Sequence, residues 1–236
     1  MTNDASCIMV VGAHAADAEI MGGATVLKHV AAAWRAVLVH MTPGEKGHGS
    51  LSPDEYARIK VEEAHHAARI LGADCVMLPY RDGELPVDVE VQWAIADTIR
   101  EYRPTLLLTH WQGSLHRDHR NTSLNVMESL FLARLPAFQR RHPAHGPSKV
   151  LYAENWEDED GFKPDLYLDV TDVFDRYVEA IHAYSLFRGE VVTFAYEQWY
   201  RGACEMRGAE GGFKRAVALM EPRSYWQRRS VADLLL

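Results

Sequence analysis

The feature that most constrains this chain is the alternation of short apolar runs with longer segments whose apolar residues recur at helical spacing. The apolar runs have the length of β-strands, and helix-like segments separate most of them. This order predicts an α/β fold with a doubly wound, mostly parallel sheet and helices on both faces. The expected strands are residues 7–11, 36–41, 75–78, 105–109, 149–153 and 166–170, and the expected helices are 19–34, 53–71, 88–102, 118–135, 171–186 and 194–207.

Length and composition favour one domain that acts on a small molecule. The 236 residues are enough for one large α/β core, and we find no internal repeat and no linker, so residues 1–236 are treated as one domain. The glycine-rich stretch 208–212 is expected to end the last helix before a short tail. A net charge of −8 argues against nucleic acid and anionic membranes as partners.

The three cysteines, Cys7, Cys75 and Cys204, lie far apart and form no CxxC zinc pattern. Cys7 and Cys75 fall in apolar runs and are expected to be buried, reduced thiols. The first residues show no signal-peptide pattern, and no apolar run approaches the length of a membrane span. These features fit a reducing cytoplasm.

Two polar clusters each follow an expected strand. His14 and Asp17 come after the first strand, and residues 110–119 come after the fourth. Asp17 alone would be an ordinary helix N-cap. Ligands of open parallel sheets, however, bind at the carboxyl ends of the strands, so two such clusters together indicate a metal site. His14, Asp17 and His119 form a two-His, one-carboxylate set, which is typical of catalytic zinc and also suits other divalent metals such as iron or manganese.

Other polar residues in these loops are candidates for chemistry or substrate binding. Asp118 could orient a histidine or carry a proton, and His116 could donate a hydrogen bond to a developing oxyanion. The candidates for substrate binding are Glu45, Arg81, Asp82 and His110, although solvated loop residues are the ordinary alternative. The acidic run 154–160 is expected to be a solvated loop, in which Trp156 is a candidate lid residue.

Two motifs carry a resemblance to a known family. Residues 13–19 read A-H-A-A-D-A-E and residues 116–119 read H-R-D-H. They resemble the A-H-P-D-D-x-E and H-P-D-H motifs of the LmbE-like (PIG-L) zinc-dependent de-N-acetylases. Residues 42–47, T-P-G-E-K-G, resemble the T-x-G-E-x-G of that family, and the helix that ends at Gly72 resembles its third block, with Lys60 where Arg is usual. The resemblance is good over the first half of the chain and loose over residues 155–236.

The resemblance implies a Rossmann-like fold and hydrolysis of an N-acetyl group, typically on a small N-acetylglucosamine-type conjugate. It also implies zinc ligation by His14, Asp17 and His119, a transition-state-stabilising role for His116, and Asp118 as the partner of His116. Members of the family are often oligomers, which makes a homo-oligomer the assembly to look for.

One departure from the family concerns its general base, whose position here is Ala16. A methyl group cannot accept a proton, and loss of a general base typically costs about 10²- to 10⁴-fold in rate. Three explanations compete. The candidates for a substitute base are Asp118, His110, Glu45 and His116; the chain is instead a catalytically silent protein that binds metal and sugar conjugates; or Ala16 is an introduced change. Ala15, where Pro is usual, argues against a single engineered change, so a divergent but working hydrolase is the favoured hypothesis.

Overall fold

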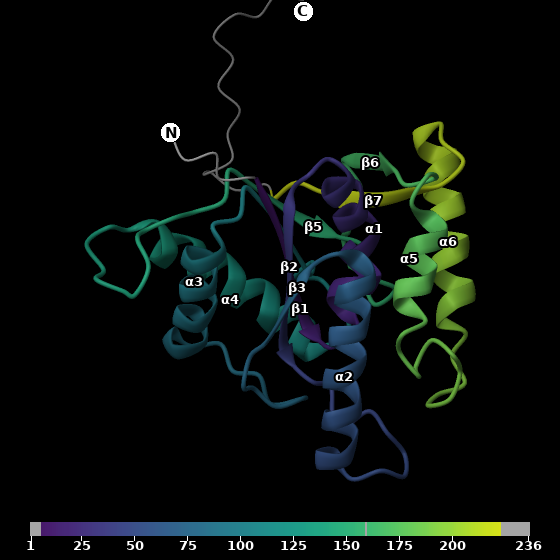
Figure 1. The fold of residues 1–236 in the computed structure, drawn as a ribbon, viewed down its shortest axis with the longest axis horizontal. Helices are drawn as coiled ribbons and strands as arrows, with labels where there is room; N and C mark the ends of the chain where they lie inside the picture. The colour runs from purple at the N-terminus through teal and green to yellow at the C-terminus, as the bar shows by residue number, and fades with distance from the viewer. Residues whose placement is uncertain (1–5, 159, 223–236) are drawn as a thin grey trace, which may run out of the picture.

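The apolar runs form one seven-stranded sheet, in the order β3-β2-β1-β4-β5-β7-β6, in the computed structural model of the chain (Figure 1). The structure describes residues 6–158 and 160–222. The strands are β1 Cys7–His14, β2 Arg35–Thr42, β3 Asp74–Met77, β4 Leu106–Thr109, β5 Lys149–Ala153, β6 Leu166–Asp169 and β7 Ala216–Met220. The helices are α1 Asp17–Ala31, α2 Pro53–Leu71, α3 Val89–Tyr102, α4 Arg117–Arg134, α5 Phe174–Ile181 and α6 Tyr196–Gly211.

Strands β1 to β5 are all parallel, which confirms the predicted α/β class. The strand order reverses between β1 and β4, which pair in register from Ile8 with Leu106 to Val11 with Thr109. At such a reversal the flanking crossover helices diverge and leave a crevice outside the carboxyl ends of the two strands. The fold therefore places a ligand-binding crevice next to His14, at the end of β1, and next to the loop that follows β4.

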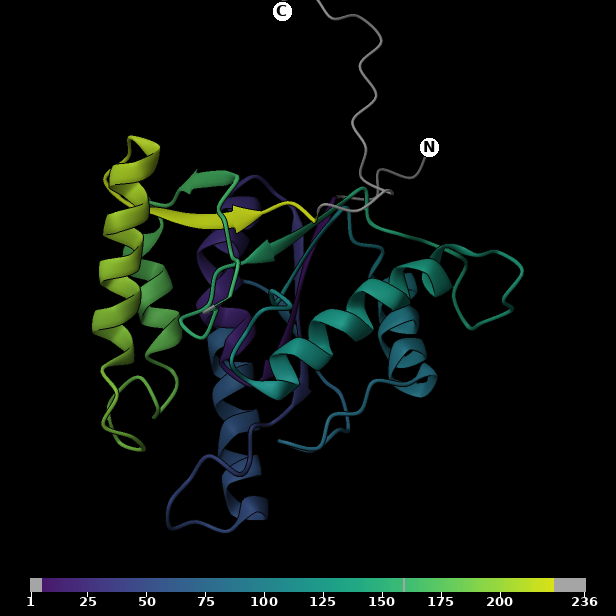
Figure 2. The same cartoon turned by 180° about the vertical axis from the view of Figure 1, so that it is seen from behind.

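Helices cover both faces of the sheet. Helices α1, α2, α5 and α6 lie on one face and α3 and α4 on the other (Figures 1 and 2). Successive side chains of strand β1 point to opposite faces of the sheet. Ile8 and Val10 belong to the core on the α1 side, and Met9 and Val11 belong to the core on the α3 side. A strand that is apolar on both faces reads as a continuous apolar run, as residues 7–11 do.

The helix ends explain several of the predicted boundaries. At the start of α2, Ser52 and Glu55 form a capping box, and Gly72 closes the same helix in the left-handed conformation. Asp88 caps α3 by accepting a hydrogen bond from the Val91 amide at 2.9 Å. At α1, however, the cap position is Ala16, and Asp17 is the first helical residue. The Asp17 carboxylate turns back to the strand and accepts a hydrogen bond from the His14 amide at 2.8 Å.

The C-terminal third differs most from the predicted elements. The glycine-rich stretch 208–212 ends the last helix only at its final residue, because α6 continues through Gly208 to Gly211 and Gly212 closes it in the left-handed conformation. Gly208 packs so closely on the backbone of Lys214 that a β-carbon there would lie 2.8 Å away, so the glycine serves close packing within the helix. Strand β7 was not predicted: it pairs antiparallel with β5 and β6 and extends the sheet.

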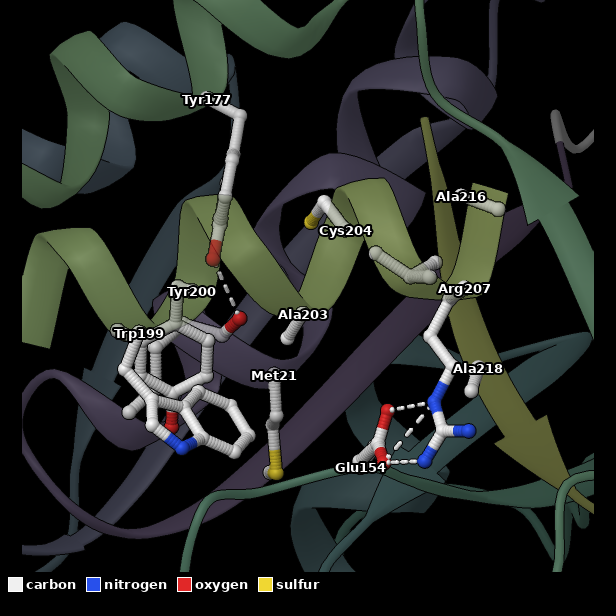
Figure 3. A pocket seen from close by; sticks show the side chains of 12 residues that line it. Met21, Glu154, Tyr177, Trp199, Tyr200, Ala203, Cys204, Arg207, Ala216 and Ala218 are labelled. Carbon is white, nitrogen blue, oxygen red and sulfur yellow. Dashed lines mark hydrogen bonds and ion pairs between the residues drawn. The ribbon is translucent and has the colours of Figure 1, made fainter. Parts of the chain in front are cut away.

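Helices α5 and α6 are held in place by polar contacts as well as by apolar packing (Figure 3). Arg207 Nε donates to Glu154 Oε2 at 2.9 Å, at the end of β5. On the adjacent α5, Tyr177 Oη donates to the Ile20 carbonyl of α1 at 2.8 Å. The expectation that Glu154 belongs to a solvated acidic loop is therefore wrong, because its carboxylate holds a helix in place.

All three cysteines are free. Cys7 is buried as expected, Cys204 is buried as well, and burial raises the pKa of the Cys7 thiol to about 11. Cys75 is only partly buried, because it lies in β3 at the edge of the sheet. None of the helices in the described residues combines the length and apolarity that crossing a lipid bilayer requires.

Candidate active site

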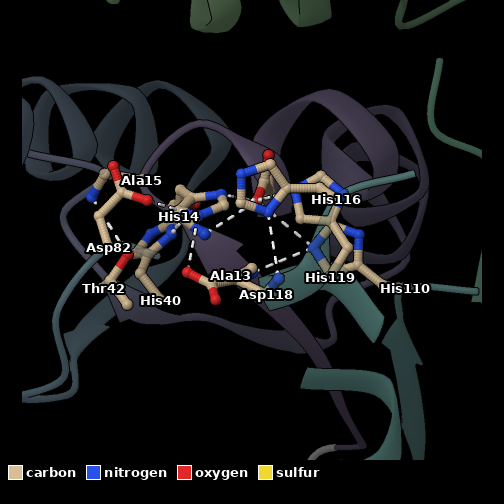
Figure 4. A network of polar contacts seen from close by, with 12 residues as sticks. Ala13, His14, Ala15, His40, Thr42, Asp82, His110, His116, Asp118 and His119 are labelled. Carbon is tan, nitrogen blue, oxygen red and sulfur yellow. Dashed lines mark hydrogen bonds and ion pairs between the residues drawn. The ribbon is translucent and has the colours of Figure 1, made fainter. Parts of the chain in front are cut away.

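The two clusters predicted from the sequence meet at the crevice between β1 and β4 (Figure 4). His14 ends β1 and Asp17 begins α1, after a two-residue turn. His110 follows β4 directly, and His119 lies in the first turn of α4. The parallel pairing of β1 with β4 therefore brings residues almost a hundred positions apart to the same edge of the sheet.

The Asp17 carboxylate lies at the centre of the cluster. Its Oδ2 atom is 3.0 Å from His14 Nδ1 and 3.1 Å from His119 Nε2. Among the described residues, three overlapping sets each bring potential ligand atoms within 4.8 Å of one another: His14, His116 and His119; Asp17, His110 and His119; and His14, Asp82 and Asp118. The predicted ligands His14, Asp17 and His119 are divided among these sets and do not form one of the three by themselves. The imidazoles and carboxylates of the cluster are nevertheless the kinds of donor that a divalent metal binds.

Carboxylates also contact the outward nitrogens of both imidazoles. His14 Nε2 lies 3.2 Å from Asp82 Oδ1 and 3.4 Å from Asp118 Oδ2. His119 Nδ1 lies 3.0 Å from Glu157 Oε2. Outer carboxylates of this kind fix the ring orientation of metal-binding histidines.

The charge states of the two imidazoles differ. Burial alone would lower the pKa of His14, but the carboxylates of Asp17, Asp118 and Asp82 outweigh burial and hold that pKa well above its ordinary value. For His119, burial and the neighbouring His110 lower the pKa to about 3. His119 is therefore neutral at physiological pH, as metal ligation requires.

His116 faces the same cavity as a neutral donor. Its Nδ1 caps α4 by accepting a hydrogen bond from the Asp118 amide at 3.1 Å. Burial and the neighbouring His14 lower the pKa of His116. Because a neutral imidazole whose Nδ1 is an acceptor carries its proton on Nε2, the Nε2–H group is available to donate.

The turn between β1 and α1 is tight and strained. Ala16 has φ of 99°, a value that side-chain-bearing residues rarely adopt and that costs about 1–3 kcal/mol. Gly12 permits the close return of the chain, because a β-carbon there would lie 2.7 Å from the Ala18 nitrogen. This turn places Ala16 on the wall of the active-site cavity.

That cavity has a volume of about 270 Å³. Its polar side is formed by the side chains of His14, Asp17, Lys60, Asp82, His116, His119 and Glu157, together with Gly44 and Gly47. Its other side carries Ile20, Trp156, Leu186, Val192 and Tyr196. The cavity therefore offers a polar floor and a largely apolar wall to a ligand.

The remaining residues predicted to bind substrate lie outside the cavity. Glu45 is buried, and its carboxylate accepts hydrogen bonds from the Asp82 amide at 3.1 and 3.3 Å. His110 is fully buried, stacks on His119 at 3.9 Å between ring centroids, and accepts a hydrogen bond from the Ala13 amide. Arg81 is exposed and does not line the cavity.

Asp118 is buried and does not line the cavity either, since its Oδ2 accepts the Gly83 amide at 2.6 Å. Of the four residues considered as substitutes for the missing base, only His116 reaches the cavity, and its Nε2 is a donor. The described geometry therefore offers no replacement among those four.

Glu157 and Lys60 line the site but were not singled out as site residues from the sequence. The expectation of a solvated acidic loop is wrong for Glu157, because it follows β5 and reaches His119. A signal was present in the sequence: β5 is parallel to β4, so the loop after it emerges at the same edge of the sheet. Lys60 looked like part of an ordinary helix, yet it is 4% exposed and lines the cavity floor.

Asp158, next to Glu157, leads to a prediction about stability. Burial, reinforced by Glu154 and Glu157, raises its pKa from 3.8 to about 8. A carboxyl group with a raised native pKa stabilises the fold below its unfolded pKa and loses that contribution as the pH rises through its native pKa. We expect Asp158→Asn to be equal to the parent near pH 4 and more stable by roughly 1–2 kcal/mol at pH 9, measured by urea unfolding at constant metal content. A stability difference that does not change with pH would contradict this assignment.

Comparison with known proteins agrees with the site. A profile of the family described as PIG-L, GlcNAc-PI de-N-acetylase, matches residues 9–130, which include both histidine clusters. The diacetylchitobiose deacetylase of Thermococcus kodakarensis is 27% identical over 231 residues, which cover 92% of this chain and 83% of that protein. The 4-oxalmesaconate hydratase of Pseudomonas putida is 25% identical over 225 residues, covering 92% and 84%.

Among solved structures, the N,N'-diacetylchitobiose deacetylase from Pyrococcus horikoshii superposes with a TM-score of 0.79 at 26% identity, covering 92% of this chain and 83% of that one. The structural match extends through the C-terminal third, where the sequence motifs are weak. The chain belongs to the PIG-L, or GlcNAc-PI de-N-acetylase, family.

Proposed function

We propose that this protein is a metal-dependent amide hydrolase that removes the acetyl group from a small N-acetylglucosamine-type conjugate. The observation that carries the proposal is the convergence of His14 Nδ1, Asp17 Oδ2 and His119 Nε2 within one cavity. Relatives named as deacetylases support the reaction class. We assign the three residues as ligands of Zn²⁺, a role that another divalent metal could fill.

A divalent metal bound there would polarise the amide carbonyl and make water more acidic. The chain's own side chains then position the substrate and handle charge. The neutral His116 presents its Nε2–H to the oxygen of the scissile amide, where negative charge develops in the transition state. Asp118 acts as a positioning residue, because it holds His14 and the Gly83 backbone in place.

The residues assigned to substrate binding act at different distances. Asp82 lines the cavity and is available to accept hydrogen bonds from hydroxyl groups. Glu45 fixes the backbone of Asp82, and the ring of His110 stacks on the ring of His119. Arg81 remains a candidate for contact with the part of a conjugate that projects out of the cavity, since it is exposed beside Asp82.

A second reaction class, hydration, is supported by two observations. One relative of similar coverage is named as a hydratase, and position 16 carries no acid. A catalytically silent binding protein is the remaining alternative. Each alternative predicts a protein that binds the metal without releasing amines.

The proposal is tested by incubating the zinc-loaded protein with N-acetylglucosamine, diacetylchitobiose and N-acetylmuramic acid and measuring the free amine released. Protein stripped with a chelator is the control. We expect metal-dependent release from at least one substrate. If none releases an amine, the protein is incubated with an unsaturated carboxylic acid, and its hydration is measured as loss of ultraviolet absorbance. Hydration identifies a hydratase, and no hydration identifies a silent binding protein.

A further inference from the structure

Lys60 is a buried cation in the active-site cavity without a close acidic partner among the described residues. Its side chain projects from α2 to the cavity floor and is 4% exposed. Its Nζ donates to the Ala15 carbonyl at 2.6 Å and lies 4.8 Å from the centre of the Tyr184 ring. An ammonium group has three donors, and the recorded contacts use one of them for a hydrogen bond.

One oxygen of each of the two glutamates near Lys60 is engaged by another group. Glu63 accepts a hydrogen bond from the Ser185 amide at 2.8 Å and faces Arg188 at 3.8 Å. Glu19 accepts the Tyr184 hydroxyl at 2.8 Å and lies 3.4 Å from His40 Nε2. In the described part of the chain, neither carboxylate forms an ion pair with Lys60, whose Nζ donates to the Ala15 carbonyl instead.

The other two acids near Lys60 belong to the candidate metal cluster. Asp17 contacts both imidazoles, and Asp82 contacts His14 and accepts the Lys46 amide at 3.0 Å. A buried ammonium group without a direct ion pair is costly. Burial lowers the pKa of Lys60 even though the charges of Glu63, Asp17, Glu19 and Asp82 oppose that shift. The cost would be offset if the ligand of the cavity supplied the anion.

Position 16 lies next to Lys60 on the same cavity. Ala16 lines the cavity, and the carbonyl of the preceding residue, Ala15, is the group that Lys60 contacts. We propose that Lys60 and the space beside Ala16 form a subsite for a carboxylate of the substrate. The substrate class is then an N-acylated amine with a carboxylate a few bonds from the amide, such as an acidic amino sugar.

This inference rests on the proposed function for the amide group of the substrate and on Lys60 for its carboxylate group. It also accounts for the absence of a base from the chain at position 16, since a substrate carboxylate held there is itself a proton acceptor next to the reacting amide. A hydrogen bond to a charged group is worth enough to change affinity by about tenfold or more.

The test measures binding without turnover, by titration calorimetry of the chelator-stripped protein with N-acetylmuramic acid and with its uncharged methyl ester. We expect the parent to bind the acid at least about tenfold more tightly than the ester. Lys60→Met should remove that preference while binding of the ester changes little, and Lys60→Arg should keep it. Lys28→Met is the matched control, because Lys28 pairs with Asp172 on the surface.

If Lys60→Met does not fold, as thermal unfolding would show, Ala16→Asp provides the second measurement, because its carboxylate would occupy the subsite and remove the preference. Equal binding of acid and ester by the parent, or a preference that survives in both variants, would overturn the inference. Absence of amine release with the acid preference intact would refute the proposed deacetylase alone.

Discussion

Ala16→Asp is expected to increase turnover of neutral N-acetylated sugars by about 10²-fold or more, the usual contribution of a general base. The reason is that the described residues considered as substitutes do not offer a base to the cavity: Asp118 and His110 are buried behind it, and His116 presents a donor. The backbone should accept the change, because Asp tolerates the positive φ of position 16 better than most residues.

The matched control is Ala16→Asn, which has the same shape but neither charge nor basicity at neutral pH. We expect this variant to stay near the parent rate on N-acetylglucosamine and diacetylchitobiose, measured as free amine released per enzyme. For N-acetylmuramic acid the new carboxylate should instead raise KM, since it competes for Lys60. If Ala16→Asp turns over the neutral sugars no faster than the parent, a base already exists in the chain and our reading of the site is wrong.

The elements around β1 could be predicted because local and tertiary signals agree there. A strand buried on both faces reads as a continuous apolar run, and caps such as Ser52 and Gly72 mark the ends of α2. The site followed from one topological rule: clusters that follow two parallel strands meet at the same edge of the sheet. That rule was enough to predict that His14 and His119 lie close together, although more than a hundred residues separate them in the sequence.

The signals disagree in the C-terminal third. Gly208 and Gly211 are usually helix breakers, but here they permit close packing of α6 against the chain around Lys214 and Tyr167. Residues 216–220 form a short apolar run, but a run of this length does not by itself distinguish a strand from a helix segment, and β7 is defined by its pairing with β5 and β6. The position of Lys60 could not be predicted for the same reason, because only the packing of α2 over the crevice shows that this lysine lies in the active-site cavity.

His119→Ala is expected to abolish stable metal binding. The imidazole supplies Nε2 to the cluster at 3.1 Å from Asp17 Oδ2, and burial keeps it neutral and able to ligate. Removal of a direct ligand should reduce zinc affinity by more than the roughly 10- to 100-fold that loss of an outer partner costs. After dialysis, we expect about one zinc per chain in the parent and almost none in the variant, measured by elemental analysis.

Glu157→Gln gives the graded comparison, because Glu157 contacts the Nδ1 atom of His119 and would act as an outer partner. Its zinc affinity should fall between those of the parent and of His119→Ala, by about 10- to 100-fold. His66→Ala, the same substitution on the exposed face of α2, should bind zinc as the parent does. Full zinc occupancy in His119→Ala would rule out the assigned ligand set, whereas equal affinities of Glu157→Gln and the parent would reject only the positioning role of Glu157.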